Sequence, residues 1–225
     1  RGTNHRGLVC TSLLGHQFLD HVVDNVLVPA VAFAGLDAPL HAATRGSYLE
    51  TVKYLVERGA GLEIVDDLGY TPLHVAAEKG DLQIVKYLID KGANLEAKND
   101  RDVTPLYLAV RSGYLAIAQY LLEQGANINA KNTSDNTPLY MAILNRDIVA
   151  ANYFLEQGAD LKNKNKYGNT PLHYAVLCGS LEIVKIFVGQ GARLDARNDL
   201  GKTALHMAIL NDDLEIVKYL LEQGA

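Results

Sequence analysis

Apolar and polar positions along residues 38–225 recur at a constant interval of 33 residues. The clearest marker is the tetrad Thr71-Pro72-Leu73-His74, whose variants begin at residues 38, 104, 137, 170 and 203. A single globular core has no reason to repeat its sequence at fixed spacing, whereas stacked units that pack only on their neighbours must do so. The pattern therefore predicts a repeat solenoid.

The tetrad predicts the start of the first helix in each unit. Thr71 can cap a helix by accepting hydrogen bonds from free amides of the first turn, and Pro72 follows where a missing N–H costs nothing. An alanine stands three residues after the tetrad leucine in every unit: Ala43, Ala76, Ala109, Ala142, Ala175 and Ala208. Such an alanine marks a close approach of two helices, where a larger side chain would overpack by about 1–3 kcal/mol. We expect a short, tightly packed first helix.

A second helix follows, with apolar residues at helical spacing, as in residues 82–88. Glycine separates the two helices in three units, and Gly-Ala follows the second helix in all six, which suits a left-handed C-terminal cap. Ser47, Arg146 and Asp212 replace the first of these glycines. We expect the turns at these three residues to be strained or differently shaped.

About ten polar, turn-forming residues join each unit to the next, as in residues 94–103. A basic residue followed by asparagine recurs in these segments and favours a tight turn at the tip of a projecting hairpin. Asp102 and Asp135 stand where other copies have glycine. We expect those two hairpins to bend differently from the others.

Residues 1–37 fall outside the repeat. Apolar residues between Leu13 and Val28 keep roughly helical spacing and predict an amphipathic helix that ends at Pro29, with a shorter helix over residues 8–14. We interpret residues 1–37 as an N-terminal helical cap or a degenerate repeat that covers the first full unit. The alternative is a helix that binds a partner.

Charge, cysteine content and the length of apolar runs argue against nucleic-acid binding, disulfide bonding and a membrane-spanning helix. The formal net charge is −5, and the 21 Lys and Arg residues are spread along the repeats, so no basic footprint for nucleic acid is visible. Cys10 and Cys178 make no metal or redox spacing, which favours a reducing compartment such as the cytoplasm. The apolar run of residues 26–36 falls short of the roughly 20 residues that a membrane helix needs. The chain begins at Arg1 and is expected to be a piece of a longer protein.

Residues 38–225 resemble the ankyrin repeat, through the tetrad, the alanine two residues after its histidine, Ile-Val-Lys, and Gly-Ala in register. The units are 38–70, 71–103, 104–136, 137–169, 170–202 and an incomplete 203–225. The resemblance implies an all-α repeat solenoid, an ankyrin-repeat array of helix-turn-helix units joined by β-hairpin loops. It also implies a concave surface of first helices and hairpins that binds other proteins, tetrad histidines that bond between units, and no catalytic group.

The chemistry-bearing residues predict no enzyme, cofactor or metal. Four of the seven histidines belong to the tetrad, and His16 and His21 do not share a helix face as zinc ligands would. Cys178 has no base within its own unit to activate it as a nucleophile. The glycines follow the repeat period and do not form a phosphate loop.

Positions that differ between units are the candidates for binding a partner protein, because positions that stack cannot vary freely. The candidates are Tyr70, Glu78, Lys79, Arg101, Val103, Arg111, Asn136, Leu144, Asn145, Tyr167, Leu177, Cys178, Lys202, Leu210 and Asn211. Leu144, Leu177 and Leu210 form a ladder spaced one unit apart. Either this ladder with Tyr167 dominates binding, or its leucines tuck between helices and deepen the core.

The leading hypothesis is a non-enzymatic protein–protein interaction module that is monomeric as an isolated domain. The alternative is a regulatory or anchoring segment of a larger multidomain protein, such as a channel, a toxin, a bacterial effector or an enzyme subunit. Secretion as an effector is compatible with either hypothesis.

Overall fold

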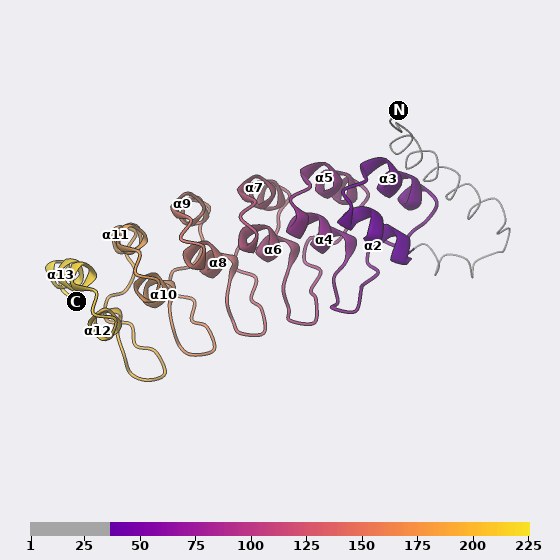
Figure 1. The fold of residues 1–225 in the computed structure, drawn as a ribbon. Helices are drawn as coiled ribbons and strands as arrows, with labels where there is room; N and C mark the ends of the chain where they lie inside the picture. The colour runs from indigo at the N-terminus through magenta and orange to yellow at the C-terminus, as the bar shows by residue number, and fades with distance from the viewer. Residues whose placement is uncertain (1–36) are drawn as a thin grey trace, which may run out of the picture.

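The computed structural model describes residues 37–225, so the predicted N-terminal cap or degenerate repeat lies outside the described residues. Within the described part, twelve α-helices form six helix-turn-helix pairs that stack side by side into an elongated array (Figure 1). The pairs follow the predicted interval of 33 residues, which confirms the all-α repeat solenoid.

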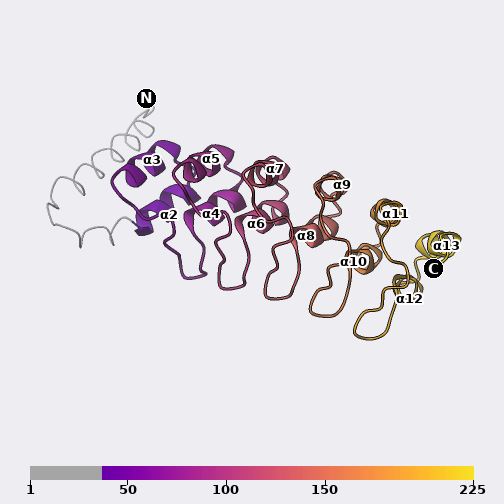
Figure 2. The ribbon, with the colours of Figure 1, turned by 180° about the vertical axis from the view of Figure 1, so that it is seen from behind.

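The helices lie in two rows, and the inner row is the one beside the loops (Figures 1 and 2). The inner helices are α2 (Asp37–Arg45), α4 (Pro72–Lys79), α6 (Pro105–Arg111), α8 (Pro138–Leu144), α10 (Pro171–Leu177) and α12 (Ala204–Leu210). The outer helices are α3 (Leu49–Glu57), α5 (Leu82–Asp90), α7 (Leu115–Glu123), α9 (Ile148–Glu156), α11 (Leu181–Gly189) and α13 (Leu214–Glu222). Across residues 37–225, every helix is too short or too polar to cross a membrane.

Side-chain caps fix where the helices begin. The Thr71 hydroxyl accepts from the His74 N–H at 3.4 Å at the start of α4, as the tetrad predicts. Three outer helices use aspartate instead: Asp81 accepts from the Ile84 N–H at 3.1 Å, and Asp147 and Asp213 cap α9 and α13 in the same way. A carboxylate there also interacts favourably with the positive end of the helix dipole. The outer helices α3, α7 and α11 begin without a side-chain cap.

The inner helices between the two ends of the array are packed between neighbours on both sides, and α4, for example, contacts α2 and α6. Their recurring alanines are buried in every unit: Ala43, Ala76, Ala109, Ala142, Ala175 and Ala208. The outer helices bury one stripe, which in α5 consists of Ile84, Val85 and Leu88. The close approach predicted from the alanines is therefore confirmed.

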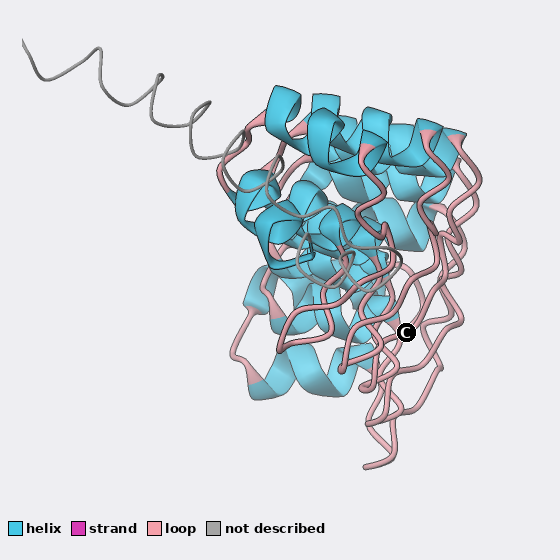
Figure 3. Cartoon of the chain, turned by 90° about the vertical axis from the view of Figure 1, so that its right-hand side faces the viewer, coloured by secondary structure: helices cyan, strands magenta, loops and turns pink. Residues whose placement is uncertain are grey.

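The loops project from one side of the array (Figure 3) and contain no strands within the described residues. Each is closed by short-range bonds instead: the Asn99 N–H donates to the Val103 carbonyl at 3.1 Å, and the Asn99 side chain accepts from the Arg101 and Val103 amides. Adjacent loops are linked by one backbone bond, as from the Thr133 N–H to the Arg101 carbonyl at 3.0 Å. The predicted β-hairpins are thus hairpin-shaped loops.

Left-handed turn residues show that the non-glycine turns keep the common shape. Asp102 and Asp135 have φ of 55° and 58°, in the same region as Gly69 at 74°. Arg146 and Asp212 have φ of 53° and 55°, again close to the glycine of the equivalent turns. The expectation that these turns and hairpins differ in shape is wrong, because neighbouring units fix the backbone. The strain remains, since a side chain is disfavoured in this conformation.

Replacing Asp212 by glycine should therefore raise the free energy of unfolding by about 0.5–1 kcal/mol. The Asp212 side chain is exposed, and the backbone bond from its N–H to the Ile209 carbonyl survives the change. Urea denaturation followed by circular dichroism measures the difference. Gly113→Asp is the matched control, because open space surrounds Gly113 and its φ is 80°, and it should destabilise by a similar amount. Equal stability of both variants and the parent would contradict the strain.

Candidate functional site

Three tetrad histidines bind the inner helix to the last residue of their own unit, and not to the next unit as the resemblance implies. His74 Nδ1 accepts from the Thr71 N–H at 3.1 Å, so its Nε2 carries the proton and donates to the Val103 carbonyl at 2.8 Å. Burial lowers the pKa of His74, which keeps the ring neutral at pH 7. His41 and His173 make the same bond to a carbonyl 29 residues later, and His206 bonds to Thr203 of its own tetrad. These rings have a structural role in the array.

Two tyrosines replace the tetrad histidine, and they behave differently. The Tyr140 hydroxyl lies 2.5 Å from the Asn169 carbonyl, which is also 29 residues later, and 3.0 Å from the Asn163 carbonyl. Tyr140 therefore takes over the histidine's bond to the carbonyl that ends the unit. The Tyr107 hydroxyl instead accepts from the Asn132 side-chain amide at 3.0 Å.

Cys178 is half-buried at the end of α10. Burial raises the pKa of its thiol, so the reactive thiolate is disfavoured. Its carbonyl, and not its sulfur, contacts Arg146. No group of three or more His, Cys, Asp or Glu residues in 37–225 is placed to hold a metal ion.

The leucine ladder is exposed. Leu144, Leu177 and Leu210 are the last residues of α8, α10 and α12, and 47%, 44% and 65% of their surfaces remain accessible. The alternative in which these leucines tuck between helices is therefore wrong. In α8 and α10 the reason is position, because Ile143 and Val176, one residue earlier, are fully buried. In α12 the residue one earlier, Ile209, is 60% exposed as well.

A cavity of about 440 Å³ opens beside the ladder. Leu177, Leu210 and Met207 line it from the inner helices, while Tyr167 and Leu200 line it from the loop tips, where they are 56% and 78% exposed. Its other lining residues are Asn169, Asn198, Asp199, Lys202 and Asn211. This is an apolar groove with a polar rim, the usual composition of a binding site. Sequence reasoning missed Met207, whose packing depends on the neighbouring loop.

The first half of the same surface is charged. Arg45 pairs with Asp66, and Arg111 pairs with Glu78 of the preceding unit. The predicted binding residues Glu78 and Arg111 therefore neutralise each other across a unit boundary. Lys79 and Arg101 are exposed, and neither forms an ion pair with any other described residue.

Several predicted binding residues belong partly or wholly to the stack. Val103 is only 4% exposed, so its predicted place on the open surface is wrong. It lies at the end of a loop, and its carbonyl accepts a hydrogen bond from His74. The Asn145 side chain donates to the Val110 carbonyl at 2.9 Å, and Asn211 makes the equivalent bond to Val176 at 3.4 Å. Tyr70 stacks on His74, and Asn136 accepts from Asn165 at 3.2 Å.

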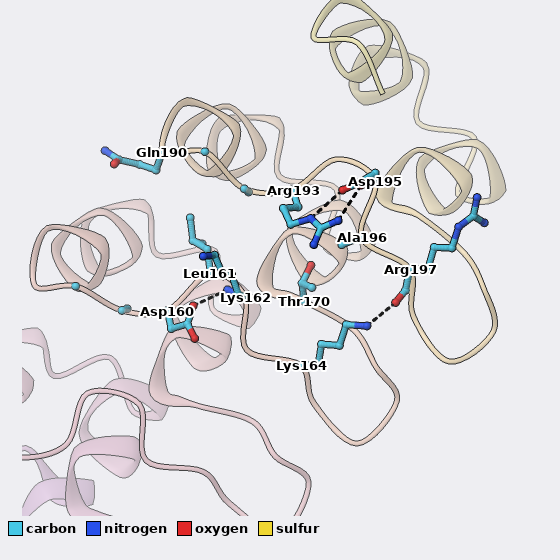
Figure 4. Close-up of a pocket in the computed structure, with 14 residues that line it drawn as sticks. Asp160, Leu161, Lys162, Lys164, Thr170, Gln190, Arg193, Asp195, Ala196 and Arg197 are labelled. Atoms are coloured by element: carbon cyan, nitrogen blue, oxygen red, sulfur yellow. Dashed lines mark hydrogen bonds and ion pairs between the residues drawn. The ribbon is translucent and has the colours of Figure 1, made fainter.

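A larger cavity of about 870 Å³ lies between the loops that follow α9 and α11 (Figure 4). Most of its charged groups already bond within the protein. Arg193 donates twice to Asp195, at 3.0 and 2.9 Å, and the Lys164 ammonium donates to the Arg197 carbonyl at 2.8 Å. The apolar groove beside the ladder is therefore the better candidate site, although it is smaller.

Comparisons with known proteins agree with this architecture. A family model described as "Ankyrin repeats (3 copies)" matches residues 40–132 and 139–225. The solved structures include the ankyrin repeat domain of Bcl-3, described as a unique member of the IkappaB protein family. It matches with a TM-score of 0.77 and 31% identity over 84% of this chain and 87% of that chain. A search of curated proteins finds no match. The chain belongs to the ankyrin-repeat family.

Proposed function

We propose that the chain is a protein-binding module whose partner docks on the ladder surface, defined as Leu144, Leu177, Leu210, Tyr167 and Leu200. Ankyrin repeats are in general protein–protein interaction modules. The single observation that carries the proposal is the exposure of three leucines in register on adjacent inner helices. Contiguous exposed apolar surface marks interaction sites, and aromatic anchors such as Tyr167 contribute much of the binding energy.

The array supports this function by being formed before the partner arrives. The inner-helix ends and loops are held by a bond within the unit, such as that of His173, and by a bond between units, such as that of Asn211. Little conformational entropy is lost on binding to such a surface. A standard interface of roughly 800 Å² per partner covers three to four units, which is the extent of the ladder with its flanking loops.

Replacing Leu144 and Leu177 by serine should weaken partner binding by about tenfold or more and leave the melting temperature nearly unchanged. Both side chains are already half in water, so their truncation removes little of the core. Affinity capture from a cell lysate with mass spectrometry identifies proteins retained by the parent chain. Calorimetric titration of the purified partner then measures its affinity for the variant.

Val149→Ser is the matched control, because Val149 is 68% exposed but lies on the outer helix α9. It should change neither the affinity nor the melting temperature. A large fall in the melting temperature of the leucine variant would show that the buried parts of these exposed leucines are needed for stability. Unchanged affinity in that variant would place the binding surface elsewhere.

A further inference from the structure

The loops that flank the inner helices change their charge along the array. The first loop, residues 60–70, has three acidic residues and no basic residue, and the second, residues 93–103, has three acidic and two basic. The middle loop, residues 126–136, has one of each. The last two loops, residues 159–169 and 192–202, have one acidic and three basic residues, then two acidic and three basic. The loop side is therefore acidic at the first units and basic at the last units.

At the basic end, the free cations lie beside the apolar groove. Lys202 lines the cavity, and the Lys166 ammonium sits 5.1 Å above the ring of Tyr167. Neither ammonium is paired with a carboxylate of the described residues, and Asp199 is the one acidic residue that lines this cavity. An acidic group on a ligand in the groove would find two unpaired partners.

At the acidic end, the first loop presents carboxylate and apolar surface together. Asp66 is held by Arg45, whereas Asp67 is exposed and has no ion pair among the described residues. Val65 and Leu68 beside it are 59% and 61% exposed. A cavity of about 450 Å³ opens between this loop and α2. A basic side chain is the complement of this end.

The ladder fits a helical ligand that runs along the array. Packed helices are about 8–10 Å apart, and residues seven apart on one α-helix face are about 10.5 Å apart along its axis. A helix with an apolar residue at every seventh position can therefore meet Leu144, Leu177 and Leu210 in turn.

We infer, resting on the proposed function, that the partner segment is an amphipathic helix lying along the array, with acidic residues beside Lys166 and Lys202 and its basic end over Asp67. The apolar stripe of that helix fills the groove, and the opposed charges fix its direction. Charge complementarity of this kind sets register and orientation more than it sets affinity.

The test is a phage-displayed library of random peptides about 28 residues long, which as helices span about 42 Å. The library is selected on the whole chain, and enriched peptides are titrated against three charge variants. Lys166→Glu with Lys202→Glu reverses the basic end, Asp67→Lys reverses the acidic end, and Lys218→Glu is the control on the outer helix α13. Leu144→Ser with Leu177→Ser reports whether a peptide uses the ladder.

The expected peptides have leucine-like residues at helical spacing, acidic residues at one end and basic residues at the other. Each reversal at an end of the array should weaken them by roughly tenfold, the weakening should shrink at high salt, and Lys218→Glu should have no effect. Ladder-dependent peptides that lack this polarity, or that bind the reversed variants equally well, would overturn the inference and leave the proposed function intact. Peptides that bind the ladder variant as tightly as the parent chain would overturn both the inference and the proposed function.

Discussion

Phe154→Ala should destabilise the array by about 3–5 kcal/mol, because it removes a large side chain from a site that cannot collapse. Phe154 is fully buried on the outer helix α9. That helix packs against α8 of its own unit and against α11 of the next unit. A cavity there weakens the interior of the fourth unit and its contact with the fifth at the same time.

The mode of unfolding should change as well as the stability. In a solenoid each unit is stabilised mainly by its neighbours, so a weak fourth unit uncouples the units before it from those after it. Urea denaturation followed by far-ultraviolet circular dichroism should show a lower midpoint and a broader transition. Val149→Ala on the same helix is the control and should change the free energy of unfolding by less than about 0.5 kcal/mol. A sharp transition with an unchanged midpoint would show that the neighbouring units close the cavity.

Most of the fold could be predicted from the sequence because the determinants of each unit are local. Thr71 caps its helix through residues three positions away, and the packing of Ala76 recurs identically at each boundary between units. Because the same motif recurs in six units, each copy supports the same prediction. The hairpin-shaped loops were the exception, since glycine and aspartate adopt the same left-handed backbone when adjacent loops fix it.

The candidate site could be predicted only in part, because exposure depends on the register between units. Leu177 and Val176 are both apolar and adjacent in sequence, yet only Leu177 is accessible. Val103 varies between units as a binding residue would, but its carbonyl and side chain serve the stack. Glu78 and Arg111 are 33 residues apart, and nothing within either unit indicates their ion pair. A residue can therefore differ between units for two reasons: it binds a partner, or it contacts another residue of the array that also differs.

Tyr107 and Tyr140, which replace the tetrad histidine, provide a test of such a substitution within the array. Tyr140→Phe should lower the free energy of unfolding by about 1–1.5 kcal/mol, because it removes the bonds of a buried hydroxyl to two carbonyls, although the Asn165 N–H still donates to the Asn169 carbonyl. The Tyr140 side chain is fully buried, and its hydroxyl is placed to donate to the carbonyls of Asn163 and Asn169. Burial also raises the pKa of Tyr140, so the hydroxyl stays protonated as a donor.

Tyr107→Phe is the matched control at the same position of the preceding unit. The Tyr107 hydroxyl accepts from Asn132, a half-buried side chain whose amide can turn to water, so its loss should cost less than about 1 kcal/mol. Chemical denaturation of the two variants compares the Tyr140 bonds to loop carbonyls with the Tyr107 bond to the Asn132 side chain. Equal losses would mean that the hydroxyl of Tyr140 only fills space. The larger loss for Tyr140→Phe would show that a tyrosine can replace the tetrad histidine because it reaches the equivalent carbonyl 29 residues later, at the end of the unit.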